Sequence, residues 1–139
     1  MKKTSYCRLL FSLAAITITL VGCQKDEIGK TTYSPDTTAP TIEITSPATG
    51  AFNSASALVI RGTVTDNKEL HSLHLELRNA NSSNVIWQNE PYVHDLEAYD
   101  LDIAVSPQTL TAGQTYVLTA RAEDHVENVR TVVVQFVAN

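Results

Sequence analysis

The stretch "LHSLHLELRN", residues 70–79, decides the fold because its apolar residues recur at every second position. Leu73, Leu75 and Leu77 fall on one side of an extended chain, and polar residues fall between them. Successive side chains of a β-strand point to opposite faces, so strict alternation of this kind indicates a half-buried strand. We therefore expect a strand here, with its leucines in the core.

The same period of two continues in both directions along the chain. Stretches rich in Pro, Gly, Asn and Asp separate the alternating runs, as expected for turns, and no helical period is sustained after Pro40. Seven short strands in about 100 residues are typical of an antiparallel β-sandwich, with a small β-barrel as the alternative. The further strands are expected at residues 41–47, 57–66, 98–105, 114–124 and 130–139, with a weaker one at 84–93.

One segment makes the expectation more specific. "LTAGQTYVLTARAED", residues 110–124, is similar to the corner before strand F of immunoglobulin-like sandwiches, where a tyrosine hydroxyl caps the turn. Tyr116 is the candidate for that role. The chain has no Cys…Trp…Cys spacing, which excludes antibody-type domains, so we expect Trp87 to lie in the core or under a loop. The predicted fold class is all-β, an immunoglobulin-like antiparallel β-sandwich of about seven strands.

The N-terminus has the pattern of an export signal. Lys2, Lys3 and Arg8 give it a positive start, and Leu9–Val21 is a run of 13 uncharged residues. A membrane-spanning helix needs about 20 apolar residues, so this run is short for a permanent span. Its length and basic flank suit a cleaved signal peptide.

The end of the apolar run carries a second signal. "LVGC", residues 20–23, resembles the lipobox of bacterial lipoproteins. That resemblance implies that the Cys23 thiol takes up a diacylglyceryl group, that cleavage follows Gly22, and that a further acyl chain is added to the new amino terminus. Two or more chains anchor a protein stably. The alternative, a disulfide with Cys7, fails because Cys7 would be lost with residues 1–22.

A flexible tether is expected between the anchor and the domain. "QKDE", residues 24–27, is similar to the lipoprotein export signal of Bacteroidota, which directs lipoproteins to the outer surface of the outer membrane. A plain solvated tether is the alternative, and it would leave the protein facing the periplasm. Residues 23–39 contain few large apolar side chains and should not fold by themselves. We expect the folded domain to span residues 40–139.

Four stretches carry a resemblance to a family. "DTTAPTIEITSPATG", "IRGTVTDNKELHSLHLEL", "TAGQTYVLTARAEDHVEN" and the valine-rich C-terminal strand resemble the Ig-like domains of Bacteroidota surface lipoproteins, in particular the DUF4625 family. The resemblance implies an Ig-like fold at the cell surface and no established activity. The chain departs from the family at His125 and Glu127, where relatives usually have small residues and a glycine.

Charge and motifs exclude several classes of function. The full chain has 10 basic and 15 acidic residues, and removal of the leader leaves 7 basic residues against 15 acidic ones, a formal charge of −8. Nucleic-acid binders show clustered Lys and Arg, so no nucleic-acid partner is expected. The nucleophile elbow, the phosphate-binding loop, H-E-x-x-H and C-x-x-C are all missing, and we expect no enzymatic activity.

Histidines and loop acids are the candidate ligands for metals. His71 and His74 should point to opposite faces of a strand, and only the fold could bring His94 and His125 together. Scattered surface histidines are the favoured reading over a zinc site, which needs three or four converging ligands. For calcium the candidates are oxygen-bearing residues at element ends, and turn formation without an ion is the favoured alternative. These residues are Asp36, Asp66, Asn67, Asp124 and Asn128.

Besides a small hydrolase without a recognisable motif, two hypotheses about function follow. The first is a lipid-anchored, non-enzymatic module that binds or scaffolds a protein or glycan partner at the outer membrane. The alternative is a metal-binding accessory lipoprotein that uses zinc or calcium. In an immunoglobulin-like topology the B–C and F–G loops share one end of the sandwich, so we expect any ligand to bind there. A metal would use Asp66, Asp124, His125 and Asn128, and a partner would contact Asn67, His71 and His94. Asp100 and Asp102, on one strand face, are expected to be solvated rather than catalytic.

Overall fold

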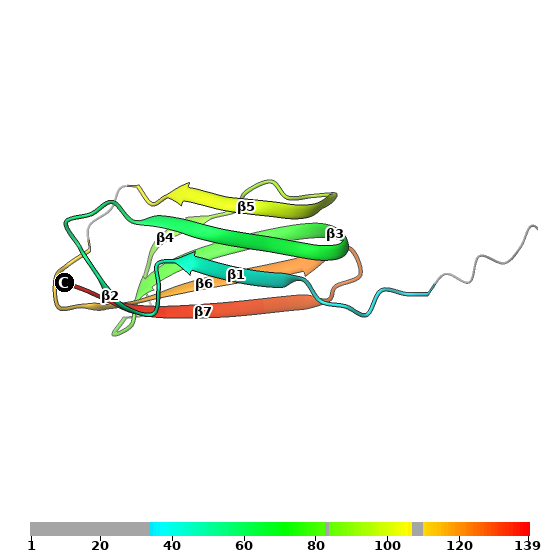
Figure 1. The fold of residues 1–139 in the computed structure, drawn as a ribbon. Helices are drawn as coiled ribbons and strands as arrows, with labels where there is room; N and C mark the ends of the chain where they lie inside the picture. Colours follow the sequence, from blue (N-terminus) through cyan, green and yellow to red (C-terminus); the bar gives the residue numbers. More distant parts are fainter. Residues whose placement is uncertain (1–33, 83, 107–109) are drawn as a thin grey trace, which may run out of the picture. The chain divides into compact units, whose positions relative to one another are not determined.

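The computed structural model describes residues 34–82, 84–106 and 110–139, and within them the chain forms seven strands and no helix (Figure 1). The expected signal peptide and Cys23 lie outside the described residues. Ser34–Asn139 is one compact unit. The strands are β1 (Thr41–Ser46), β2 (Gly50–Phe52), β3 (Val59–Asn79), β4 (Val85–Asn89), β5 (Leu96–Ala104), β6 (Thr115–Asp124) and β7 (Val129–Ala138).

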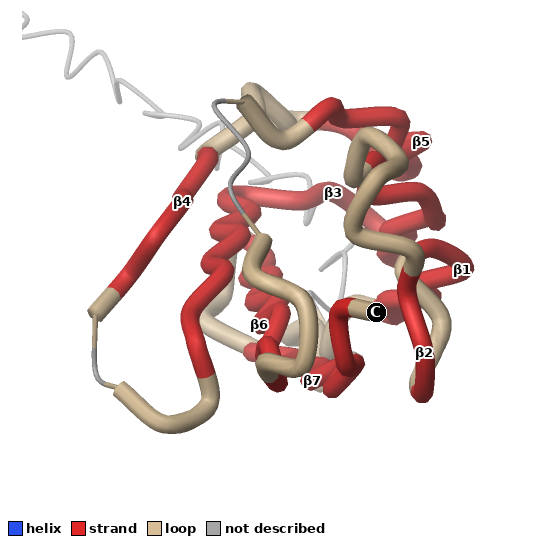
Figure 2. Tube along the Cα trace, turned by 90° about the vertical axis from the view of Figure 1, so that its left-hand side faces the viewer, coloured by secondary structure: helices blue, strands red, loops and turns tan. Residues whose placement is uncertain are grey.

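Strand β3 runs through both layers of the sandwich. Its first part, Val59–Thr65, pairs antiparallel with β1 and β5, and its second part, from Leu70 to Asn79, pairs antiparallel with β4 and β6. β7 pairs with β6, and β2 adds to β7 in parallel. Figure 1 shows β1 and β5 above β6 and β7, and Figure 2 shows β4 and β5 on opposite sides of β3. The predicted all-β sandwich is confirmed.

Two local features of this topology differ from the sequence-based expectation. The loop expected around Asp66 and Asn67, between the strands at 57–66 and 70–79, does not form: these residues continue β3, and the pairing register of the strand shifts there. Asp66 accepts the Lys68 backbone N–H in the way that favours a turn, but the pairing of β3 on either side keeps these residues within the strand. β2 was not predicted, because three residues are too few to show a period.

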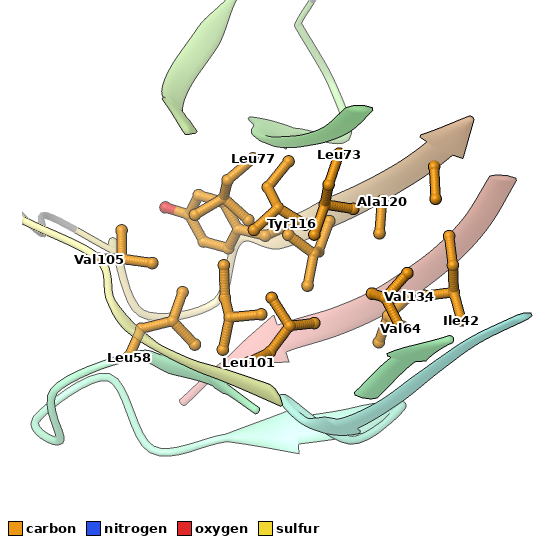
Figure 3. Packing of buried hydrophobic residues seen from close by; sticks show 14 of the residues in the cluster. Ile42, Leu58, Val64, Leu73, Leu77, Leu101, Val105, Tyr116, Ala120 and Val134 are labelled. Carbon is orange, nitrogen blue, oxygen red and sulfur yellow. The ribbon is translucent and has the colours of Figure 1, made fainter. Parts of the chain in front are cut away.

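The core lies between the two layers and follows the predicted alternation. Leu73 and Leu77 of β3 and Tyr116 of β6 face Val64 of β3 and Leu101 of β5 across it (Figure 3). Each of these side chains is buried, and burying one such side chain contributes about 1.5–3 kcal/mol. The alternation seen in the sequence therefore places one apolar face of each layer against the other.

The tyrosine corner is confirmed. Tyr116 is buried, and its hydroxyl accepts a hydrogen bond from the Thr111 backbone N–H at 2.8 Å. This bond fixes the turn that leads into β6. Trp87 of β4 is half-buried and packs against the edge of the core.

Candidate cation-binding end of the sandwich

Ligand-bearing side chains gather at one end of the sandwich. They come from the segment before β1, the bend of β3, the turn before β5 and the turn between β6 and β7. Figure 1 shows the β6–β7 turn, the start of β1 and the bend of β3 at the same end. Two clusters form there, one of carboxylates and one of histidines. The prediction that the loops around residues 66 and 124 share an end agrees with this arrangement.

The carboxylate cluster contains Asp36, Asp66 and Asp124. One oxygen from each lies within 4.8 Å of the others. Asp124 is only 2% exposed, and it is the one buried charged side chain of the described residues. Its Oδ1 accepts hydrogen bonds from the backbone N–H groups of Val126 and Asn128, at 2.9 and 2.8 Å. This bonding shapes the β6–β7 turn.

Two asparagines join the three acids. Asn128 Nδ2 donates to Asp124 Oδ2 at 2.7 Å and to the Asp36 carbonyl at 3.2 Å. Asn67 Nδ2 donates to Asp36 Oδ2 at 2.8 Å. The segment before β1 is therefore tied to the sandwich through Asp36. The backbone hydrogen bond from Thr38 is the main reason that the pKa of Asp36 lies below its ordinary value, and the bond from Asn67 adds to it.

All three acids also form the local turns that aspartate favours. Each accepts a hydrogen bond from the backbone N–H two residues later, at Thr38, Lys68 and Val126. The expected turn formation is thus present. It does not account for Asp66 Oδ1, which is buried and has no hydrogen-bond partner among the described residues. A buried oxygen of this kind costs about 1–3 kcal/mol if nothing binds it.

The histidine cluster contains His71, His94 and His125. Their ring centroids lie 4.7–5.2 Å apart, and one nitrogen from each ring lies within 4.8 Å of the others. Three of the four histidines therefore converge, and the favoured reading of scattered surface histidines is wrong. The fold brings together residues that are 23 and 31 positions apart in the sequence.

Asp95 links two of these imidazoles. Its Oδ1 lies 2.8 Å from His94 Nδ1 and 2.9 Å from His125 Nε2. The hydrogen bond with His94 is the main reason that the pKa of Asp95 lies below its ordinary value, and His125 acts in the same direction. The Asp95 backbone is left-handed, with φ 65°, and its N–H donates to the Leu70 carbonyl at 2.9 Å. The carboxylate is thereby held beside β3. Glu69 also approaches this group, within 4.8 Å of Asp95 and His125.

A β-bulge explains the place of His71. Leu70 pairs with Asp124 and Ser72 pairs with Glu123, so His71 is an extra residue that the β6 strand does not match. Such a bulge breaks the alternation of the strand and redirects one side chain. As a result His71 and His74 do not point to opposite faces, as predicted, but line the same groove. His74 Nδ1 contacts Glu90 Oε1 at 2.9 Å and takes no part in the cluster of three.

The groove extends from the histidine cluster along β3. It has a volume of about 530 Å³ and lies between β3 and the connection that follows β4. Tyr92, 80% exposed, forms part of its wall and stacks on His94 with 6.3 Å between ring centroids. An exposed aromatic ring thus stands beside the candidate site.

The predicted site residues fall into two separate clusters in the structure. Asp66, Asp124, Asn67 and Asn128 share the carboxylate cluster, but His125, predicted to bind a metal with them, belongs to the histidine cluster. Sequence reasoning missed the role of Asp95, whose only signal was its position next to His94. The solvated face expected for Asp100 and Asp102 is present, since both are exposed, and Asp102 pairs with Arg61 at 3.0 Å.

Comparison with known proteins adds no family. No family model matches the chain, and no curated protein is significantly similar to it. The expected relationship to Ig-like surface lipoproteins stays a prediction. Within residues 34–82, 84–106 and 110–139 there is no helix with the length and apolarity needed to cross a bilayer.

Proposed function

We propose that this chain is a non-enzymatic, lipid-anchored module at the surface of the outer membrane that binds a hard divalent cation, of the calcium class, at the carboxylate cluster. The observation that carries the proposal is Asp66 Oδ1, a buried oxygen without a hydrogen-bond partner beside two further carboxylates. Calcium takes oxygen ligands from carboxylates, amides and carbonyls. An ion here would satisfy that oxygen and offset the mutual repulsion of Asp36, Asp66 and Asp124.

The same ion would join three segments of the chain. Asp36 precedes β1, Asp66 lies in the bend of β3, and Asp124 ends β6. A cation bound by all three would hold the segment next to the tether against the domain. The expected role is therefore to fix how the domain is presented from its anchor when the ion is bound.

Thermal unfolding tests whether the domain binds a cation. With excess calcium at about 100 times its dissociation constant, the domain should gain about 2.7 kcal/mol over the protein in EDTA. Asp66→Asn should remove most of that gain, because it takes away the charge of the buried oxygen. Asp100→Asn, on the exposed face of β5, is the matched control and should keep the gain. An equal melting temperature in calcium and in EDTA for the unchanged protein would end the proposal.

Membrane fractionation tests the anchor. Replacing Cys23 with alanine removes the thiol that would carry the lipid, so the protein should move from the membrane fraction to the soluble one. Protease added to intact cells should degrade the unchanged protein if it faces outward. Retention of Cys23→Ala in washed outer membranes would contradict lipid anchoring.

A second candidate function is the binding of a glycan in the groove. Tyr92 offers an exposed ring face, and His74 and Glu90 beside it offer hydrogen-bonding groups. A sugar ring needs both kinds of contact. In an NMR titration with a glycan panel, shifts along the groove that Tyr92→Ala abolishes and Ile86→Ala, at exposed β4, retains would support this function. Shifts that Tyr92→Ala leaves unchanged would remove it.

A further inference from the structure

We infer that His71, His94 and His125 form a second metal site, which takes a first-row transition-metal dication of the zinc type. This inference goes beyond the calcium-class site and depends on different residues. Its basis is the convergence of three imidazoles from three separate elements, with nitrogens within 4.8 Å of one another. Each histidine comes from a different place in the chain, so neighbouring positions in one strand or helix do not account for the cluster.

The chemistry of the donors separates the two sites. Imidazole nitrogen suits zinc, copper and nickel, whereas carboxylate and amide oxygens suit calcium and magnesium. The carboxylate cluster contains no histidine. In the histidine cluster the three imidazoles lie together, and two carboxylates, Asp95 and Glu69, lie beside them. Two adjacent sites at one end of the domain should therefore select different ions.

The three imidazole nitrogens need to move only a short distance toward one another to bind one ion. With zinc–nitrogen bonds of about 2.0–2.1 Å, two ligand nitrogens in a tetrahedral site lie roughly 3.4 Å apart. The nitrogens here are within 4.8 Å, and the side chains of His94 and His125 are 41% and 36% exposed. Their rings can rotate toward an ion without moving the core. Three imidazoles leave the fourth position of a tetrahedral metal for water.

Asp95 acts as the positioning residue of this site. Histidine ligands usually donate their second ring N–H to a carboxylate or carbonyl, which fixes the tautomer and the orientation of the ring. Asp95 Oδ1 lies within hydrogen-bonding distance of one nitrogen of His94 and one of His125. With those nitrogens bonded to Asp95, the second nitrogen of each ring, His94 Nε2 and His125 Nδ1, would be the metal ligand. The backbone bond from Asp95 to Leu70 holds the carboxylate in place.

Calorimetric titration with Zn²⁺ alone tests the site. The probe protein is the full chain in mild detergent, without a polyhistidine tag and with Cys7 and Cys23 replaced by serine, so that no thiol competes. We expect one Zn²⁺ per chain. His71→Ala, His94→Ala and His125→Ala should each weaken binding at least 10-fold. Co²⁺ in place of Zn²⁺ should give the visible absorption of a tetrahedral site, which the three variants should lose.

Two further variants make the test specific. His74→Ala is the matched control, because this histidine lines the same groove but pairs with Glu90, and Zn²⁺ affinity should stay unchanged. Asp95→Asn removes the charge that orients two rings and should weaken binding about 10-fold. Asparagine tolerates the left-handed backbone at this position, so the turn should persist. Circular dichroism confirms that each variant is folded.

The outcomes separate this site from the calcium-class one. If Zn²⁺ does not bind at millimolar concentration, or binds equally to the variant lacking all three histidines, the inference fails. If calcium still stabilises the protein in that case, the proposed function survives. If Zn²⁺ binds and calcium does not, only the proposal for the carboxylate cluster is overturned.

Discussion

At Glu127 the backbone adopts a left-handed conformation, with φ 67°, in the turn between β6 and β7. This conformation costs most residues with a Cβ about 1–2 kcal/mol, and glycine adopts it without that cost. The turn keeps this shape because Asp124 accepts the N–H groups of Val126 and Asn128 on either side.

Glu127→Gly should therefore stabilise the domain. The gain expected is about 0.5–1 kcal/mol, since relief of the left-handed cost exceeds the extra freedom of glycine in the unfolded chain. A urea titration followed by tryptophan fluorescence measures it. Glu97→Gly is the control, because Glu97 lies in β5, where glycine should lower the midpoint. A lower midpoint for Glu127→Gly would contradict this account.

At the scale of elements, β3 organises the molecule because it belongs to both layers. Gly62 is paired with Ile44 of β1 on one side and with Leu101 of β5 on the other. A Cβ at this position would overlap the Glu43 carbonyl of β1. Glycine is thus required here by the close approach of β1, rather than by a turn.

Gly62→Ala should push β1 away from β3. Overpacking of this kind typically costs about 1–3 kcal/mol, and the unfolding midpoint in urea should fall accordingly. Thr63→Ala, at the next and exposed position of the same strand, should change the free energy of unfolding by less than about 1 kcal/mol. A similar loss in both variants would mean that strand propensity, and not the contact with Glu43, sets the effect.

The elements also explain how far the sequence could predict the fold. Alternation identified the strands with Leu73–Leu77 and Tyr116–Ala122, because burial on one face leaves a period that any window of eight residues reveals. β2 was missed because its stability comes from pairing with β7, a contact far away in the sequence. The bend of β3 was mistaken for a loop because it contains Asp66 and Asn67, and these residue types are typical of turns.

Like the fold, the candidate site could be predicted from the sequence only in part. Fold topology brought Asp66 and Asp124 together, and topology was readable from the strand pattern. His71 was not predictable as part of a cluster, because its direction depends on a one-residue bulge set by the pairing of β3 with β6. The role of Asp95 depends on a left-handed backbone and a bond to Leu70. Neither the left-handed backbone nor this hydrogen bond could be predicted from the sequence pattern.

At the scale of the whole molecule, three carboxylates meet where the chain enters the domain. Asp36 belongs to the segment before β1, yet its bonds go to Asn67 in the bend of β3 and to Asn128 after β6. Oxygens of Asp66 and Asp124 lie within 4.8 Å of an Asp36 oxygen, and the ammonium group of Lys68 also lowers the pKa of Asp36. The pKa of Asp36 lies below its ordinary value of 3.8, mainly because of the Thr38 N–H. The free energy of unfolding should therefore depend on pH through Asp36.

The direction of that dependence follows from proton linkage. Since the pKa of Asp36 is lower in the folded state, the unfolded state binds more protons near pH 4, and stability falls as the pH falls. The contribution should be complete above about pH 5 and should disappear as the pH drops through 3.8 toward the folded pKa. Urea titrations in EDTA at pH 5.5 and pH 3 measure it without interference from bound cations.

Asp36→Asn should flatten this dependence. Asparagine still offers an oxygen to the Thr38 N–H but carries no proton that titrates, so the variant should be less stable than the unchanged protein at pH 5.5 and should lose less on acidification. Asp100→Asn, in the exposed face of β5, should keep the full slope. If Asp36→Asn and the unchanged protein lose equal stability between the two pH values, the segment before β1 is not held by the charge of Asp36.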